Sequence, residues 1–339
     1  MAVTFKGDKK MQVLQVGLGS MGRRRICCLK RLGYADIIGY DPREDRRKEA
    51  CDRYAIEVVD SLKKVDFDSI GMMLISTPPD RHDGYIALAV ENRIPAFVEA
   101  SVVLGKLEGL AKAASNAKVL IAPSCTLRYH PGIKRIADMV RSNRYGKVTN
   151  FTYHAGQYLP DWHPFENVKD FYVSKKKTGG AREIVPFELT WITGLLGFPV
   201  RVSGFNGKTM DVGADIDDTY SIVMEFKPKA FGLLQVDVVS RYAIRNLILN
   251  MEYGQVLWRW DENVIRLYDA RKRTWGACKY SQEKAARGYN KNIAENMYVD
   301  ELRDFISATQ GTGTFPNTLK EDIAILKLLK NIERYNEKR

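Results

Sequence analysis

The sequence predicts an α/β protein in which a doubly wound parallel sheet is followed by an α+β domain with a large open antiparallel sheet. Three observations favour this fold class. A glycine-rich turn follows a short apolar segment near residue 17, strand and helix patterns alternate up to about residue 125, and from residue 148 the apolar period becomes two. The expected domains are residues 1–125 and 126–339, an arrangement in which the C-terminal helices can pack back on the first domain.

The turn near the start of the chain has the spacing of a dinucleotide site. The segment QVLQVGLGSMGRRR runs from an apolar strand through Gly17, Gly19 and Gly22 into an amphipathic stretch. Gly17 allows the tight turn, Gly19 lets the backbone approach a pyrophosphate, and Gly22 lets helix and strand pack. Ser20 and Met21 begin the helix, whose N–H groups and dipole favour an anion. The pattern is typical of a Rossmann domain.

An acidic residue ends the second predicted strand. Asp41 follows residues 37–40 and lies 19 residues after Gly22, where a carboxylate hydrogen-bonds the adenosine ribose hydroxyls. A carboxylate repels the additional phosphate of NADP, whereas Arg43 could accept that phosphate. We therefore expect NAD as the cofactor, with NADP as the alternative.

The rest of the first domain continues the alternation. Ser76, Thr77 and Pro78 follow the fourth strand and are expected to line the path from adenosine to nicotinamide, and Pro78 and Pro79 prevent regular structure there. We expect His82 to shape this loop and to start the next helix. The predicted elements are helix 21–32, strand 37–40, helix 44–54, strand 57–59, strand 71–76, helix 81–92, strand 96–99, helix 106–115 and strand 119–122.

Beyond a helix at 131–142, the second domain consists mainly of strands joined by short turns, which is typical of an antiparallel sheet. One helix, 183–196, interrupts them after Gly179 and Gly180, and Pro186 removes a hydrogen bond from it unless it lies in the first turn. Helices 297–309 and 319–335 end the chain. The expected strands are 148–155, 200–208, 218–227, 230–239, 245–252, 254–260, 264–269 and 274–279.

Composition argues against several classes of protein. The formal net charge is +12, partly from Arg23–Arg25 and Lys175–Lys177, but no nucleic-acid-binding motif accompanies it. Cofactor phosphates, an anionic substrate or a solvated surface would each account for the charge. No apolar run approaches the ~20 residues of a membrane span, and no secretion signal begins the chain. The five cysteines and four histidines lack disulfide or metal spacing, which favours a reducing cytoplasm and no metal site.

Seven segments together resemble the Gfo/Idh/MocA family, named after glucose-fructose oxidoreductase and inositol dehydrogenase. They cover almost the whole chain: VGLGSMGRRRI (16–26), ISTPPDRH (75–82), FVEASVV (97–103), LRYHP (127–131), GQYLPDWHP (156–164), GGAREIVPF (179–187) and FPNTLKEDIAILKLL (315–329). The resemblance implies a Rossmann domain, a sugar-type substrate and a C-terminal open sheet that commonly serves as an oligomer interface. It also implies that Glu99 and Ala100 lie near the nicotinamide riboside.

The chain departs from this family at the catalytic pair. Typical members carry Glu-Lys-Pro after the fifth strand, and an Asp and a His one helical turn apart after Gly-Gly. Here Glu99 is followed by Ala100, and the positions after Gly-Gly are Glu183 and Phe187, so the lysine and the histidine are both missing. One positioned acid/base group typically contributes about 10²–10⁴-fold to the rate. The loss predicts either another route for the proton or no dehydrogenase activity.

Nearby side chains could replace the missing pair. Glu183, Tyr158 and His163 are the candidates for proton transfer, with Arg182 and Glu188 beside them. Each candidate also has a simpler interpretation. His163 can be a structural or surface residue, Tyr158 can pack or contact a substrate hydroxyl, and the two glutamates can balance Arg182 or cap the helix.

Two classes of function remain. The first hypothesis is an NAD(P)-dependent oxidoreductase that transfers hydride to or from a sugar, sugar acid or nucleotide sugar, including redox-neutral variants that oxidise the sugar transiently. The second is a catalytically silent dinucleotide-binding sensor, partner subunit or scaffold, because the glycine turn is kept while the catalytic pair is not. In either case we expect a cytoplasmic homo-oligomer, a dimer or tetramer, that binds neither nucleic acid nor membrane.

Overall fold

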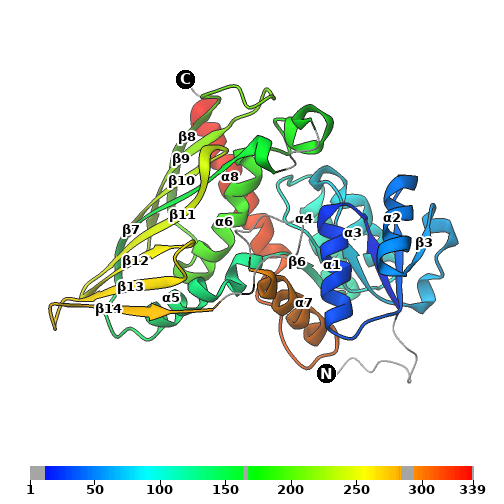
Figure 1. The fold of residues 1–339 in the computed structure, drawn as a ribbon, viewed down its shortest axis with the longest axis horizontal. Helices are drawn as coiled ribbons and strands as arrows, with labels where there is room; N and C mark the ends of the chain where they lie inside the picture. Colours follow the sequence, from blue (N-terminus) through cyan, green and yellow to red (C-terminus); the bar gives the residue numbers. More distant parts are fainter. Residues whose placement is uncertain (1–11, 163–166, 282, 284–293, 338–339) are drawn as a thin grey trace. The chain divides into compact units, whose positions relative to one another are not determined.

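The chain separates into two compact units. The structure, a computed structural model, describes residues 12–162, 167–281, 283 and 294–337. The first unit comprises Met1–Cys125 and Tyr298–Ala324, and the second comprises Thr126–Met297 and Ile325–Arg339 (Figure 1). The C-terminal segment is therefore shared, and the division falls inside the last helix.

A six-stranded parallel sheet forms the centre of the first unit. Its order, β3-β2-β1-β4-β5-β6, is the doubly wound order of a Rossmann domain and confirms the predicted fold class. The strands are β1 (Gln12–Val16), β2 (Ile37–Tyr40), β3 (Glu57–Val59), β4 (Ile70–Ile75), β5 (Ala96–Val98) and β6 (Ile121–Pro123). The helices are α1 (Ser20–Arg31), α2 (Glu44–Tyr54), α3 (His82–Glu91), α4 (Leu107–Ala117), α7 (Glu295–Thr309) and α8 (Leu319–Glu337), with short 3₁₀ turns η1 (Leu62–Lys64), η2 (Phe67–Ser69) and η3 (Pro79–Arg81).

The central strands of this sheet are apolar on both faces. Val13, Leu14 and Val16 of β1 are fully buried, as expected for a parallel strand that is covered on both sides. Phe97 of β5 packs edge-to-face on two phenylalanines of the C-terminal segment, Phe305 and Phe315, with ring centroids 5.7 and 6.1 Å away. These aromatic contacts join the C-terminal segment to the core of the first unit.

An eight-stranded sheet, β14-β13-β12-β11-β7-β10-β9-β8, forms the second unit. The predicted antiparallel sheet is confirmed except between β7 and β10, which run parallel. A helix and two strands lie between them in the chain and provide the crossover that a parallel pair needs. The strands are β7 (Val148–Tyr158), β8 (Arg201–Gly207), β9 (Thr219–Phe226), β10 (Ala230–Asp237), β11 (Val239–Met251), β12 (Gly254–Arg259), β13 (Val264–Asp269) and β14 (Thr274–Lys279).

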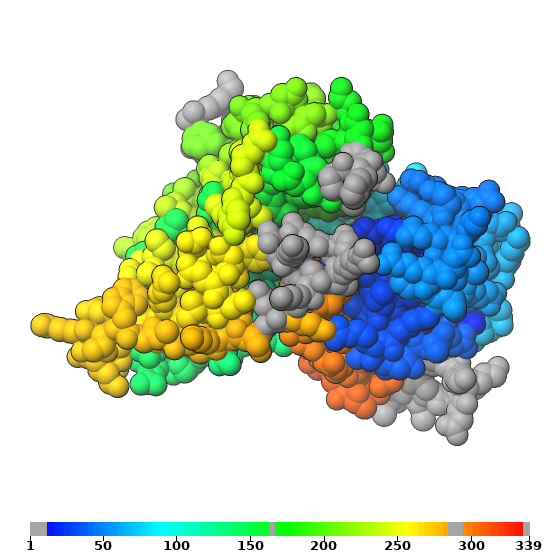
Figure 2. Space-filling view, viewed as in Figure 1, coloured from blue at the N-terminus to red at the C-terminus, as the bar shows by residue number. Residues whose placement is uncertain are grey.

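Helices cover one face of this sheet and leave the other face open. Figure 1 shows α5 (Pro131–Arg141), α6 (Ala181–Leu196) and the second part of α8 on the covered face, where Leu189, Ile192 and Leu329 pack into one core with the strands. The residues of the turn between β13 and β14, 270–273, are all exposed at the edge of the sheet (Figure 2). Short 3₁₀ turns complete the unit: η4 (Thr126–Tyr129), η5 (Leu159–Asp161), η6 (Val168–Asp170) and η7 (Tyr172–Ser174).

Helix α6 starts two residues earlier than the sequence predicts. It begins at Ala181, after Gly180 with φ +64°, so Pro186 lies inside the helix and beyond its first turn. Proline has no N–H, so the carbonyl of Arg182 loses its usual helical partner. The rest of the helix compensates through burial, since nine of the ten residues from Ile184 to Thr193 are buried.

Candidate functional site

The turn between β1 and α1 has no room for a Cβ at two of its three glycines. Gly17 has φ +87°, and a Cβ there would lie 2.4 Å from the Ser76 carbonyl oxygen. A Cβ on Gly22 would lie 1.9 Å from the Gly17 carbonyl oxygen, whereas one on Gly19 would meet the Arg46 guanidinium at 3.4 Å. Helix α1 begins directly after Gly19, and among the described residues no side chain caps it and no acid stands in its first turn. Bare backbone and a helix N-terminus together suit a phosphate group.

A buried amide supports this turn from inside the sheet. Gln15 is 0% exposed, and its Nε2 donates to the carbonyl oxygens of Gly17 (3.1 Å) and Val16 (3.3 Å). The side chain thereby satisfies backbone carbonyls that the tight turn leaves in the interior. Sequence analysis missed Gln15, and the signal that could have found it is a lone polar residue inside the apolar strand that precedes the first glycine.

Asp41 joins the end of β2 to the glycine turn. Its carboxylate is buried, and it accepts hydrogen bonds from the backbone N–H groups of Leu18 and Arg43, both at 2.9 Å. Arg46 Nη1, on α2, lies 3.6 Å from the same carboxylate, while the Arg43 side chain pairs with Asp45. The structure thus brings Asp41 to the turn and adds Arg46, a cation whose sequence context, a run of charged helical residues, gave no sign of this position.

The loop after β4 lies beside the same turn. Ser76 N donates to the Val16 carbonyl at 2.8 Å, and His82, the first residue of α3, has its Nε2 2.9 Å from the Thr77 carbonyl oxygen. Burial lowers the pKa of the His82 ring, which is therefore neutral. His82 Nδ1 and Thr77 Oγ1 are buried without partners among the described residues, so a bound group could satisfy them. Pro78 caps the short turn that follows.

A buried arginine links α1 to β5 and α7. Arg25 donates to both oxygens of Glu99, at 2.6 and 3.1 Å, and to Glu301 Oε2 at 2.9 Å. Glu301 Oε1 in turn accepts from Ser124 Oγ (3.0 Å) and Cys125 N (2.6 Å). Burial by itself would lower the pKa of Arg25, but the two carboxylates raise it above its ordinary value. The triad fixes the Glu99 carboxylate, next to Ala100, at the end of β5.

One interpretation of the positive charge is that the arginine run after the glycine turn faces the cofactor phosphates. The structure argues against this interpretation, because each of the three arginines makes contacts elsewhere in the unit. Arg23 pairs with Glu49, Arg24 lies over the Tyr298 ring at 4.4 Å, and Arg25 is enclosed. The helical period points successive residues in different directions, so a run of three charges cannot face one ligand.

In the second unit, Glu183 is a carboxyl in the first turn of α6. The residue is partly buried and its Oε2 is fully enclosed, with no hydrogen-bond partner among the described residues. The Tyr172 hydroxyl donates to Oε1 at 2.7 Å. Burial raises the pKa of Glu183 to about 7, although the bond from Tyr172 lowers it in part. A carboxyl that titrates near neutrality can accept or donate a proton.

Among the described residues, no hydrogen bond joins Tyr158 to Glu183. Tyr158 is the last residue of β7 and pairs with Val239 of β11, and its ring lies under the Arg241 guanidinium at 3.9 Å, a cation–π contact. His163 lies outside the described residues. Glu183 therefore differs from Tyr158 in offering an enclosed carboxyl with a pKa near neutrality.

Glu188 pairs with Arg245 and not with Arg182. It is fully buried, Oε1 accepts from Arg245 Nε at 2.9 Å, and Oε2 accepts from the Tyr153 hydroxyl (2.7 Å) and Trp191 Nε1 (3.2 Å). Arg182 pairs instead with a glutamate of α8 at 2.6 Å. The interpretation of the α6 glutamates as partners of Arg182 is wrong, because six helical residues place Glu188 on a different face. Glu188 anchors α6 to the sheet.

Searches for two other kinds of site were negative. Within the described ranges, no three His, Cys, Asp or Glu side chains converge as a metal site requires. None of the helices in that part of the chain is long and apolar enough to span a membrane.

Comparisons with known proteins agree with this architecture. Residues 133–256 match the family model of the GFO/IDH/MocA C-terminal domain. A search of curated protein sequences finds no match. Together with the solved structures below, the match confirms the resemblance that the sequence motifs indicate.

Three solved structures illustrate the shared fold. An oxidoreductase from Agrobacterium radiobacter, in complex with NAD+, L-tartaric acid and magnesium, is 12% identical with a TM-score of 0.84, over 97% of this chain and 96% of that one. Levoglucosan dehydrogenase in complex with NADH is 14% identical with a TM-score of 0.83, over 97% of both chains. A UDP-N-acetylglucosamine 3-dehydrogenase from Acidithiobacillus ferrooxidans is 14% identical with a TM-score of 0.77, over 96% and 97%.

Proposed function

The chain joins a Rossmann-type unit to the C-terminal domain of the Gfo/Idh/MocA oxidoreductases, and from this premise we propose that it is an NAD-dependent oxidoreductase of a carbohydrate. The observation that carries the proposal is the glycine turn, whose three glycines leave no space for a Cβ at two positions and expose a helix N-terminus. Structures that share the fold include a levoglucosan dehydrogenase and a UDP-N-acetylglucosamine 3-dehydrogenase, which supports a sugar or nucleotide sugar as substrate.

The residues present fit a dinucleotide. The backbone from Gly17 to Gly22 would hold the pyrophosphate, Asp41 the adenosine ribose, and the loop 76–78 with Glu99 the nicotinamide side, where Thr77 Oγ1 has an unused hydrogen bond. When bound, the cofactor supplies an acceptor or a donor for hydride. Asp41 favours NAD because a second negative charge would lie against a buried carboxylate, and the Arg43 side chain is engaged by Asp45.

Glu183 is the group we assign to proton transfer. Oxidation of a secondary alcohol requires a base for the hydroxyl proton, and the enclosed Glu183 carboxyl changes charge near neutral pH. Tyr172 orients it through one oxygen, and the other oxygen has no partner in the part of the chain that the structure describes. This arrangement offers a single carboxyl, whereas the resemblance implies a lysine and a histidine at the positions of Ala100 and Phe187.

Cofactor binding and hydride transfer can be tested separately. We expect NADH to raise the unfolding temperature of the protein and to bind with a Kd that fluorescence titration can measure. NADPH should bind at least about tenfold more weakly, a difference of about 1.4 kcal/mol in binding free energy. Mixing the NAD-loaded protein with a panel of sugars, sugar acids and nucleotide sugars should then give absorbance at 340 nm from at least one compound. Absence of binding by either reduced cofactor, in folded protein, would contradict the proposal at its first step.

A Glu183→Gln variant is expected to lower the rate of hydride transfer by about 10²–10⁴-fold and to remove its rise with pH through about 7. The matched variant is Tyr172→Phe. Because the Tyr172 hydrogen bond lowers the pKa of Glu183, its loss should move the midpoint of the pH–rate profile to higher pH while activity persists. An unchanged profile in both variants would assign the proton to another group.

The second candidate function is a catalytically silent dinucleotide-binding protein. Ala100 and Phe187 favour it, because neither can carry a proton at positions where the resemblance implies a lysine and a histidine. This candidate predicts cofactor binding with no reduction of NAD by any compound of the panel, and a Glu183→Gln variant that is indistinguishable from the wild type.

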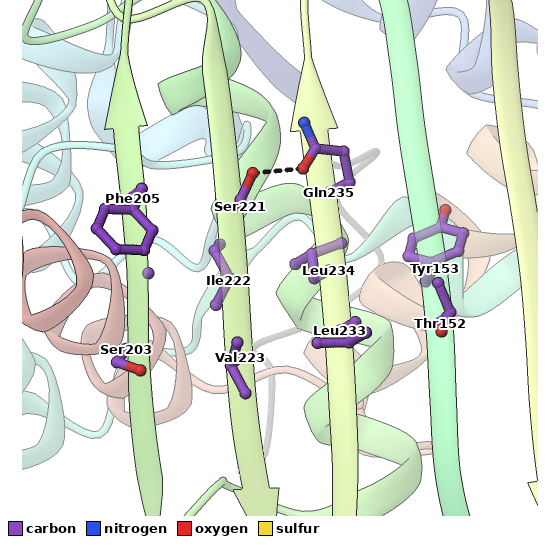
Figure 3. Close-up of a pocket in the computed structure, with 11 residues that line it drawn as sticks. Thr152, Tyr153, Ser203, Phe205, Ser221, Ile222, Val223, Leu233, Leu234 and Gln235 are labelled. Atoms are coloured by element: carbon purple, nitrogen blue, oxygen red, sulfur yellow. Dashed lines mark hydrogen bonds between the residues drawn. The ribbon is translucent and has the colours of Figure 1, made fainter.

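We also propose that the open face of the second sheet binds a second copy of the chain. Val223, Leu233 and Ile248 lie in register on this face, on either side of Thr152, and Val223, Leu233, Ile248 and the nearby Phe205 are 44–52% exposed. Phe205, Val223 and Leu233 line a hollow of about 360 Å³. Figure 3 shows these residues, with the Ser221 hydroxyl hydrogen-bonded to Gln235 Oε1 at 2.6 Å beside them. An apolar stripe flanked by polar pairs is typical of an isologous contact.

A Leu233→Glu variant should therefore have a lower mass in light scattering than the wild-type oligomer, because paired copies would bury the new charge. Lys272→Glu, in the exposed turn between β13 and β14, is the control and should leave the mass unchanged. A monomeric wild type would contradict this proposal.

A further inference from the structure

The C-terminal segment brings a second enclosed carboxyl to the parallel sheet. Asp322, in the first turn of α8, is 3% exposed and accepts a hydrogen bond from the side chain of Ser101, which is 4% exposed. Its Oδ2 has no hydrogen-bond partner among the described residues. Ser101 stands three residues after β5, so the pair lies at the carboxyl edge of the sheet, where doubly wound proteins bind their ligands.

The other charged groups at this edge are already balanced. Glu99 and Glu301 share Arg25, and His82 is neutral. On α8 itself, Glu321 accepts hydrogen bonds from the backbone and hydroxyl of Thr318, in a capping box. Asp322, by contrast, has a hydroxyl and no cation within ion-pair distance in the described part of the chain.

The pKa of a buried carboxyl that has no ion-pair partner depends strongly on any charge that binds close to it. Burial raises the pKa of Asp322 to about 7, and the Ser101 hydrogen bond lowers it only in part. Because the environment excludes water, a charge added close to the carboxyl acts on it more strongly than it would in solution. The charge of Asp322 can therefore change within the range of pH in which an enzyme works.

The position of the pair relates it to one half of a dinucleotide. In a doubly wound sheet each half binds one mononucleotide, and Asp41 at the end of β2 marks the adenosine half. The nicotinamide half then corresponds to β4–β6, which includes the strand that leads to Ser101. The oxidised nicotinamide ring carries a positive charge, and the reduced ring carries none.

We propose that Ser101 and Asp322 form a redox-linked proton acceptor, ionised against the oxidised cofactor and protonated against the reduced one. The inference rests on the proposed function. When the substrate C–H and O–H bonds break to give C=O, the hydride with its electron pair goes to NAD+ and one proton is released. The hydroxyl proton goes to Glu183, which returns it to solvent. The ring loses its positive charge in the same step, so the Asp322 carboxylate loses its counter-charge and takes up one proton from solvent. The overall reaction then neither releases nor consumes a proton.

The test measures cofactor affinity against pH and needs no substrate. For the wild type, the Kd of NAD+ should fall about tenfold between about pH 6 and 8, and the Kd of NADH should not fall, because linkage makes each site bias the other equally. Calorimetry in buffers of different ionisation enthalpy should show a fraction of a proton, up to about one, released on NAD+ binding near neutral pH.

Matched variants assign the effect to one group. Asp322→Asn, which imitates the neutral carboxyl and keeps an acceptor for Ser101, should make the NAD+ affinity independent of pH and abolish proton release. Ser101→Ala removes a bond that lowers the pKa of Asp322 and should shift the midpoint to higher pH. Glu321→Gln, which removes the neighbouring carboxylate of α8 and keeps an acceptor for Thr318, should retain the wild-type profile.

Three results would overturn the inference: a flat NAD+ profile in the wild type, an unchanged profile in Asp322→Asn, or loss of the profile in Glu321→Gln. Thermal unfolding of Asp322→Asn confirms that the variant is folded when its affinity is measured. If neither NAD+ nor NADH binds at any pH, the proposed function itself fails, which is a different outcome from pH-independent binding.

Discussion

We expect an Arg25→Met variant to unfold with a free energy about 3–5 kcal/mol below that of the wild type, which chemical denaturation would measure. The Arg25 side chain is fully enclosed, and it is the cation that balances Glu99 and Glu301. Its removal takes away the cation that lies 2.9 Å from the Glu301 carboxylate, which is 0% exposed, so this carboxylate is favoured to take up a proton or admit water. A loss of this size is a large part of the ~5–15 kcal/mol that stabilises a typical domain.

Two further variants distinguish this cause from loss of packing. If the uncompensated charges cause the loss, a triple variant with Arg25→Met, Glu99→Gln and Glu301→Gln should recover most of the stability, since neutral groups of similar shape replace the whole set. Arg43→Met removes an ion pair whose side chains are 55% and 63% exposed, and should change the free energy by less than about 1 kcal/mol. Equal losses in the single and triple variants would show that packing, and not charge, decides the result.

The second sheet shows which parts of the fold the sequence predicts. Strands 264–269 and 274–279 agree residue for residue with β13 and β14, because alternation and turn composition are local properties of the chain. The parallel pairing of β7 with β10 could not be predicted from such patterns. It depends on a crossover through α6, β8 and β9, and on the long-range packing that selects which strand edge β10 joins.

The candidate site likewise has parts that the sequence predicts and parts that it does not. The glycine turn and Asp41 lie within 25 residues of one another and have a recognisable spacing. Arg25 and Glu301 are 276 residues apart, and Ser101 and Asp322 are brought together only because the C-terminal segment packs into the first unit. Glu188 accepts three hydrogen bonds, whereas one oxygen of Glu183 has no partner among the described residues. This difference depends on how each side chain is buried, which cannot be predicted from the residue type.

A Gly22→Ala variant is expected to bind NADH at least about a hundredfold more weakly than the wild type, equivalent to about 2.7 kcal/mol. The new methyl group would lie 1.9 Å from the carbonyl oxygen of Gly17 and 2.8 Å from its carbonyl carbon, and both atoms belong to backbone that cannot rotate away. The turn must open to accommodate it, which moves the start of α1 away from the phosphate position. Fluorescence titration with NADH measures the loss, and thermal unfolding measures how much of the fold survives.

Two other glycines serve as matched controls, because they differ from Gly22 in what a methyl group would meet. Gly84 is in α3 with no atom within 4 Å of an added Cβ, so Gly84→Ala should raise stability by about 1 kcal/mol and leave the NADH affinity unchanged. At Gly19 the neighbour is the movable end of the Arg46 side chain at 3.4 Å, so Gly19→Ala should fold normally and still bind NADH more weakly. A Gly19→Ala variant with wild-type affinity would mean that no ligand backbone or phosphate approaches this glycine, and the pyrophosphate would then have to bind elsewhere on the unit.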